Sequence, residues 1–331
     1  MCSRDMDRGC AWESSEVGRL RGMSACAEPL SVAPAPEDGL ALRFYEVTSA
    51  DGTVLRAWTN DVEGPVLLLC NGLGTNPYAW PALLDPDCGV RVVSWNHRGV
   101  GGSARPTDPD RVGQEEFVED ALAVLDIGGV VACAVAGWSI GVNTMFELAV
   151  TRPERVTGLF ALAGVPGETF GSMGAPLFIP RFARKPIATA VARLLGLVGN
   201  PLHRVTSRLE IGPCAGRVVT HSGFMLPVTD EPLARLAIRE FLTTPTDWYS
   251  HLALASSLHA RVPLHSIDVP TTFVAGRYDV LAASHDMRTA SERIPSAQYV
   301  ELPGSHFLQM EKPREVHALL LELLDRVALR G

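Results

Sequence analysis

The stretch VVACAVAGWSIGVNTMFELAV, residues 130–150, places a serine between two glycines where one sequence pattern gives way to another. Residues 130–136 form a short apolar run rich in valine, typical of a buried strand, and residues 140–150 show the apolar spacing of a helix. Ser139 therefore lies on a predicted strand-to-helix turn, with a glycine two residues to either side. This G-x-S-x-G setting is typical of a nucleophile elbow, whose tight turn exposes the serine hydroxyl and requires small neighbours. The alternative is a glycine-rich helix start with an exposed serine.

Further apolar runs of the same kind alternate with helical patterns along the chain. Most are apolar on both faces, as strands of a parallel sheet covered by helices are. Near the amino terminus, LRFYEVTSADGTVLRAWTN (42–60) predicts two strands joined at an Asp-Gly turn. The alternation predicts an α/β fold with a mostly parallel central sheet flanked by helices. The other predicted strands are 65–70, 90–95, 156–164, 271–276 and 298–302, and the clearest helices are 115–127, 140–150 and 313–329.

About a hundred residues after the strand at 156–164 break the alternation, because they contain helical pieces and no good strand. The clearest piece is PIATAVARLLGLVG (186–199), in which Ile187, Val191 and Leu194 share one side. Such a length is too great for a structureless loop, so we expect a helical lid inserted into the core. In chain order, we expect a mobile tail (1–39), the first part of the core (40–165), the lid (166–265) and the second part of the core (266–331).

Charge and cysteine content argue against several classes of partner. The net charge of −8 argues against nucleic acid or an anionic membrane as the main partner, because both call for clustered Lys and Arg. The seven cysteines form no C-x-x-C or Cys/His cluster with metal-ligand spacing, so no metal is expected. An odd number of cysteines, with no signal-peptide pattern, predicts a reducing cytoplasm. No run approaches the roughly 18 apolar residues of a membrane span.

A serine nucleophile needs a base, and the base needs an acid that orients it. His306 follows the last predicted strand, and Asp279 follows the strand before it. Because the carboxyl ends of parallel strands meet at one edge of the sheet, both side chains are expected beside Ser139. The simpler interpretations are a surface histidine and a turn-forming aspartate. Glu168, just past an earlier strand, is the alternative acid.

Main-chain N–H groups near the serine predict an oxyanion hole. The N–H of Ile140, at a helix start, points where an oxyanion would form. A second donor is expected from the loop after an early strand, and Leu73 in NGLG (71–74) fits because glycines let the backbone approach the substrate. The alternative is that NGLG is only a turn.

The segment GVGGSA (99–104) matches the dinucleotide-binding pattern G-x-G-x-x-A. That pattern needs a helix starting within the motif to hold the pyrophosphate. Here RPTDPD follows, with Pro106 and Pro109 and no helical period, so the dinucleotide hypothesis fails and no cofactor is expected.

Together, NGLG, SWNHRGVGGS, GWSIG, AGRYD and GSHFLQMEKP resemble the α/β-hydrolase superfamily, most nearly its lid-bearing serine esterases and lactonases. The resemblance spans about residues 41–165 and 266–331. It implies the α/β-hydrolase fold, with Ser139 as nucleophile, His306 as general base and then acid, and Asp279 as its orienting acid.

The same resemblance implies that Leu73 and Ile140 donate to the oxyanion. It is imperfect at three positions, where Asn71, Trp138 and Asn96 stand in place of the usual His, His and Asp. Dehalogenases and epoxide hydrolases of this fold use an aspartate nucleophile, and the serine at position 139 argues against both.

These observations predict a cytoplasmic serine hydrolase that cleaves an ester-like acyl bond of a hydrophobic small molecule through an acyl-enzyme. Acyl transfer and carbon–carbon bond hydrolysis on the same triad are alternatives, as is a non-catalytic ligand receptor on the same scaffold.

Apolar side chains in the first part of the predicted lid (168–186) either seal it onto the core or line the substrate pocket. The second hypothesis predicts a preference for uncharged, medium-sized hydrophobic esters over acetate esters and charged substrates. These side chains are Phe170, Met173, Leu177, Phe178, Ile179 and Phe182.

Overall fold

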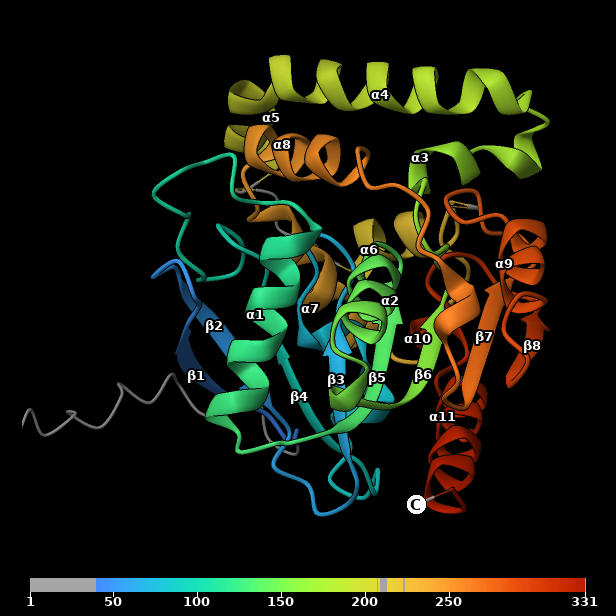
Figure 1. Ribbon diagram of the computed structural model, residues 1–331. Coiled ribbons are helices and arrows are strands. Elements are labelled where there is room, and N and C mark those ends of the chain that lie inside the picture. Colours follow the sequence, from blue (N-terminus) through green and yellow to red (C-terminus); the bar gives the residue numbers. More distant parts are fainter. Residues whose placement is uncertain (1–39, 207, 209–212, 223, 331) are drawn as a thin grey trace, which may run out of the picture. The chain divides into compact units, whose positions relative to one another are not determined.

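The computed structural model describes residues 40–206, 208, 213–222 and 224–330 (Figure 1). The predicted tail, residues 1–39, lies outside the described residues. Within the described part, the strands form one eight-stranded sheet in the order β1-β2-β4-β3-β5-β6-β7-β8. The pairs β1–β2 and β2–β4 are antiparallel and the rest are parallel, so the predicted mostly parallel sheet is confirmed. The strands are β1 Arg43–Thr48, β2 Val54–Thr59, β3 Val66–Cys70, β4 Arg91–Trp95, β5 Cys133–Trp138, β6 Val156–Leu162, β7 Thr271–Gly276 and β8 Ala297–Leu302.

Helices follow or separate most of the strands. They are α1 Gln114–Ile127, α2 Gly141–Thr151, α3 Thr169–Ser172, α4 Arg181–Leu197, α5 Gly199–Thr206, α6 Pro213–Thr220, α7 Glu231–Leu242, α8 Thr246–Ser256, α9 Ser284–Ser291, α10 Leu308–Glu311 and α11 Pro313–Ala328. Short 3₁₀ turns lie at Pro77–Ala79, Pro81–Leu83, Pro153–Arg155, Ala175–Leu177 and Leu264–Ser266.

The central strands are buried on both faces, as their continuous apolar runs predict. In β3, Leu68 packs in a cluster with side chains of α1, α2 and α9, whereas Leu67 and Leu69 pack in a second cluster with α11. All three leucines are inaccessible to solvent. Successive side chains of a strand point to opposite faces, so a strand between two helical layers must be apolar at every position.

The predicted amino-terminal hairpin is present. β1 and β2 pair from Arg43 with Thr59 to Thr48 with Val54. At the turn between them Gly52 has a φ of +84°, a conformation that glycine adopts without strain.

Between β6 and β7 the described residues form helices α3 to α8 and no strand. We refer to residues 163–270 as the insertion. Figure 1 shows α4 lying across the carboxyl-end side of the sheet, beyond α8, and these two helices pack together. The limits of 166 and 265 for a separate lid domain stay a prediction. In the described part of the chain, none of the helices has the length and apolar character needed to cross a membrane.

Candidate active site

The turn between β5 and α2 holds Ser139 in a conformation that few side chains adopt. Its φ is +57°, in the left-handed region. A Cβ at Gly137 would lie 2.7 Å from Val142 Cα, and a Cβ at Gly141 would lie 1.9 Å from the carbonyl oxygen of Cys70. Because neither position has room for a side chain, the two glycines are what allow this tight turn. The predicted strand, turn and helix are thus confirmed.

The structure brings the three predicted side chains together. His306 Nε2 lies 2.8 Å from Ser139 Oγ, and His306 Nδ1 lies 2.8 Å from Asp279 Oδ2. The carboxylate of Asp279 is fully buried, and its Oδ1 accepts the N–H groups of Leu281 and Ala282. An ionised carboxylate can only accept hydrogen bonds, so the imidazole proton lies on Nδ1. The lone pair of Nε2 then faces the serine hydroxyl.

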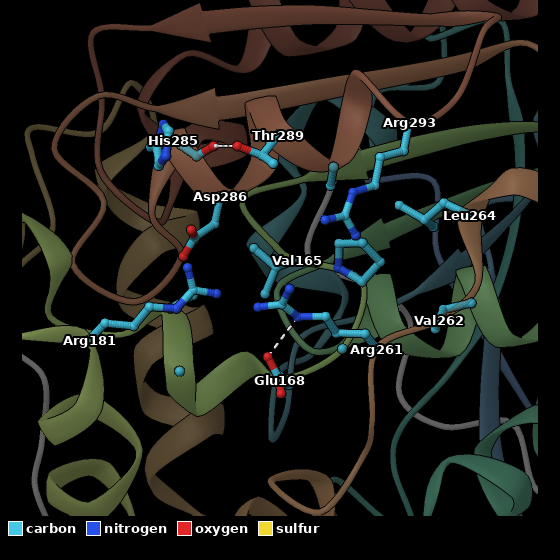
Figure 2. A pocket seen from close by; sticks show the side chains of 15 residues that line it. Val165, Glu168, Arg181, Arg261, Val262, Leu264, His285, Asp286, Thr289 and Arg293 are labelled. Atoms are coloured by element: carbon cyan, nitrogen blue, oxygen red, sulfur yellow. Dashed lines mark hydrogen bonds and ion pairs between the residues drawn. The ribbon is translucent and has the colours of Figure 1, made fainter.

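Glu168, the alternative acid, lies elsewhere. Its carboxylate is half exposed and accepts a hydrogen bond of 2.7 Å from Arg261. Figure 2 shows this pair in a hollow of about 180 Å³ that is also lined by Arg181 and Arg293. Neither Ser139 nor the other triad side chains line this hollow. Asp279 is therefore the carboxylate that contacts the imidazole.

Two main-chain N–H groups lie in the loops where an oxyanion hole was predicted. Leu73 is on the loop after β3, and Ile140 directly follows Ser139; among the described residues neither N–H donates a hydrogen bond to the main chain. Asn71 fixes the first loop, since its Oδ1 accepts hydrogen bonds from Trp80 Nε1 at 3.0 Å and from the N–H of Gly72 at 3.1 Å. Both N–H groups are therefore available to donate to an oxyanion.

A cavity of about 700 Å³ opens onto Ser139 and His306. Its size is within the range of small-molecule binding sites. The core contributes Leu73, Trp138 and Phe307 among others, and the insertion contributes a largely apolar wall. The residues of α7 and α8 in this wall are Ala237, Ile238, Phe241, Leu242 and Tyr249.

The hypothesis that the first part of the predicted lid lines this cavity is wrong. None of its six apolar residues is among the cavity residues. Phe170 is buried in a cluster with α8, while Phe178 and Phe182 are 93% and 84% exposed. The reason is the order of the helices in the insertion. Helix α3 packs on α4, and α4 packs on α8, so α3 and α4 lie outside the helices that face the cavity.

Two residues that hold the loop of His306 were not predicted. Trp138 Nε1 donates a hydrogen bond of 3.0 Å to the main-chain carbonyl of His306. Glu311 accepts the N–H groups of Ser305 and Leu226, both at 2.8 Å. The only indication of these roles in the sequence is position: Trp138 directly precedes the serine, and Glu311 follows the histidine by five residues.

Other reactive side chains do not form a second centre in the described part of the chain. No three His, Cys, Asp or Glu side chains there are grouped as a metal ion would require. Cys70 and Cys133 are buried and unpaired, and burial raises the pKa of Cys133 to about 11. That thiol is therefore protonated at neutral pH and a poor nucleophile.

A family model for the alpha/beta hydrolase fold matches residues 65–313. The chain belongs to the α/β-hydrolase family. It is 27% identical over 299 residues to epoxide hydrolase A of Mycobacterium tuberculosis, which covers 80% of this chain and 92% of the relative. It is 28% identical over 262 residues to a putative carbamate hydrolase, RutD, of Azorhizobium caulinodans, covering 78% and 90%. The crystal structure of an enol-lactonase from Burkholderia xenovorans superposes with a TM-score of 0.62 and 22% identity, covering 85% of this chain and all of that one.

The family match confirms the predicted α/β-hydrolase fold and a hydrolase class of enzyme. The segment GVGGSA, the rejected dinucleotide motif, forms part of a turn, and residues 96–113 contain no helix. The two prolines that follow the motif account for this.

Proposed function

We propose that this α/β-hydrolase is a serine hydrolase that cleaves ester-like acyl bonds of hydrophobic small molecules. The observation that carries the proposal is the pair of 2.8 Å contacts by which His306 links Ser139 to Asp279. A serine hydroxyl becomes an effective nucleophile only when a positioned base takes its proton.

The reaction proceeds in two halves. Ser139 Oγ attacks the acyl carbon while His306 Nε2 takes its proton, and the N–H groups of Leu73 and Ile140 stabilise the negative charge on the carbonyl oxygen. His306 then gives that proton to the leaving alcohol as the carbon–oxygen bond breaks, which leaves an acyl group on Ser139. Water, deprotonated by His306, attacks this ester, and the acid is released with the serine restored.

The predicted preference for hydrophobic substrates now rests on a different set of residues. The cavity wall from the insertion consists mainly of apolar and aromatic side chains, including Ile238, Phe241 and Leu242. Transfer of an acyl chain into such a cavity is favourable by about 0.8 kcal/mol per CH₂. A charged acyl group would lose its hydration without gaining a charged partner.

Epoxide hydrolysis is the competing activity, because several of the relatives are epoxide hydrolases. The residue at the elbow argues against it. A serine that opened an epoxide would form an ether, and an ether offers no carbonyl carbon for water to attack. An aspartate nucleophile would form an ester, which water can cleave. Ser139 therefore favours acyl chemistry.

The test uses a fluorophosphonate probe and a series of p-nitrophenyl esters from acetate to octanoate. We expect covalent labelling of Ser139 and a rise in kcat/KM of about fourfold per added CH₂ until the cavity is filled. Ser139→Ala should lose the label and most of the turnover. A flat or falling series, a preference for anionic acyl groups, or labelling of another residue would contradict the proposal.

The remaining alternatives give different products. Acyl transfer would place the acyl group on an added alcohol in preference to water. Hydrolysis of carbon–carbon bonds would require turnover of a diketone and not of esters. A ligand receptor would bind tightly and turn over less than once per protein.

A further inference from the structure

The outer side of α4 and the segment before it carries an unusual concentration of exposed apolar side chains. Eight of the large apolar residues that are exposed in the described part of the chain fall between residues 177 and 198. Their exposed fractions range from 41% to 93%. Within α4, the spacing places Ile187, Val191, Leu194 and Leu197 on one side of the helix, and Phe182 is exposed in its first turn. The eight residues are Leu177, Phe178, Phe182, Ile187, Val191, Leu194, Leu197 and Val198.

The opposite side of α4 fixes this orientation. Ala192 is buried, and its main-chain carbonyl accepts a hydrogen bond of 2.6 Å from Ser250 Oγ of α8. A Cβ at Gly196 would lie 2.8 Å from the same Oγ. Because only small residues fit against α8, the helix cannot rotate to bury its larger side chains. Figure 1 shows α4 as the outermost helix over α8.

Phe178 adds a second sign that this side is built for contact. It has a φ of +59°, in the left-handed region, although it is 93% exposed and packs against little of the protein. A bulky residue in that conformation is unusual and costs conformational energy. The main-chain N–H of Phe178 closes the 3₁₀ turn Ala175–Leu177, but its side chain buries little surface against the protein.

The charge of this part of the chain differs from that of the rest. Residues 169–229 contain seven basic residues and one acidic residue, a net charge of +6 in a chain whose net charge is −8. On α4, Lys185 and Arg193 are exposed, and neither forms an ion pair within the described residues. The net charge of −8 for the whole chain therefore conceals a positively charged segment.

We propose that this outer face of α4, residues 177–198, docks on the surface of an anionic lipid bilayer. Exposed Phe, Leu, Ile and Val side chains enter the boundary between headgroups and acyl chains, while Lys and Arg bind lipid phosphates. The face has protruding side chains along a single helix, and a bilayer accepts such a face without shape complementarity. Docking on the bilayer does not depend on turnover at Ser139.

A second copy of this chain fits the face less well. A symmetric dimer through residues 177–198 would bring two segments of net charge +4 against each other. Like charges at an interface repel, whereas an anionic bilayer is attracted to both the charge and the apolar side chains. The dimer is therefore an outcome to be tested and not the expected one.

The experiment is co-sedimentation of the full chain with vesicles of phosphatidylcholine, alone or mixed with phosphatidylglycerol. We expect binding to the mixed vesicles that weakens as salt is added. Lys185→Glu with Arg193→Glu should lower the partition coefficient by at least about 25-fold, since each basic residue contributes about fivefold. Phe182→Ser with Leu197→Ser should lower it by about tenfold or more per residue.

Matched controls lie on and just beyond α11. Arg314→Glu and Leu329→Ser change exposed residues of the same kinds, and both should bind like the wild type. Ser139→Ala should also bind like the wild type, which separates this proposal from the proposed activity. Thermal melting checks that each variant is folded.

Three results would overturn the proposal. The first is no binding to the mixed vesicles at low salt. The second is equal binding by the α4 variants and their controls. The third is a dimer, seen by sedimentation velocity, that the two serine substitutions dissociate while vesicles remain unbound.

Discussion

The indole Nε1 of Trp138 donates a hydrogen bond of 3.0 Å to the main-chain carbonyl of His306, so the residue before the serine fixes the loop that carries the histidine. The two rings also lie beside each other, with centroids 5.9 Å apart. Residues 303–307 have no regular secondary structure, and such side-chain bonds are what hold the imidazole in place.

We expect Trp138→Phe to lower kcat by about tenfold with little change in KM, because one buried hydrogen bond is lost while the aromatic ring is kept. Steady-state kinetics on a p-nitrophenyl ester measure both constants. The matched control is Trp58→Phe, since Trp58 is equally buried and its Nε1 has no hydrogen-bond partner. Equal losses in the two variants would show that Trp138 only stabilises the fold.

Asp279→Asn should cut kcat by up to about 10⁴ while the protein stays folded. An asparagine can keep its oxygen toward Leu281 and Ala282, which turns its NH₂ toward His306 Nδ1. The imidazole must then carry its proton on Nε2 and cannot accept one from Ser139. Glu168→Gln, at the half-exposed partner of Arg261, should retain nearly full kcat. The reverse order of activities would make Glu168 the acid.

The sequence predicted the sheet and the proximity of Ser139, Asp279 and His306 because both depend on local patterns and one topological rule. Each strand is a continuous apolar run, and parallel strands deliver their following residues, such as Asp279 and His306, to one edge. The supporting bonds could not be predicted, since Trp138 meets His306 across 168 positions of sequence. Periodicity also showed that α4 has an apolar side but not whether that side faces the core or the solvent.

His97 predicts a pH dependence of stability. It is 3% exposed, lies edge-on to Phe117, and burial lowers its pKa to about 4. In the unfolded chain the pKa of a histidine is about 6.5. Between about pH 6.5 and pH 4, therefore, the unfolded state binds a proton at His97 that the folded state does not. The free energy of unfolding should therefore fall as the pH drops, by about 2 kcal/mol between pH 7.5 and pH 5.

Urea unfolding of the wild type and His97→Gln across this range measures that contribution, because the variant lacks the imidazole and should show a shallower decline. His265→Gln, at an exposed position, controls for the loss of one histidine. Parallel declines in the wild type and His97→Gln would show that His97 does not cause the effect.

Glu311 joins the loop of His306 to the insertion. Its buried carboxylate accepts the N–H of Ser305 through Oε2 and the N–H of Leu226 through Oε1. Leu226 directly follows Phe224 and Met225, which line the cavity. One carboxylate therefore ties the loop of His306 to a wall of the cavity.

We expect Glu311→Gln to lower both the melting temperature and kcat/KM, the latter by about tenfold. A carboxylate offers acceptors on both oxygens, whereas the amide of glutamine presents NH₂ on one side. One of the two N–H groups then faces another donor and stays unpaired, which costs about 1–3 kcal/mol in a buried site. Glu315→Gln is the control, because Glu315 is half exposed and forms an ion pair with Lys312. If Glu311→Gln lowers the melting temperature but leaves kcat/KM unchanged, Glu311 stabilises the fold without positioning His306.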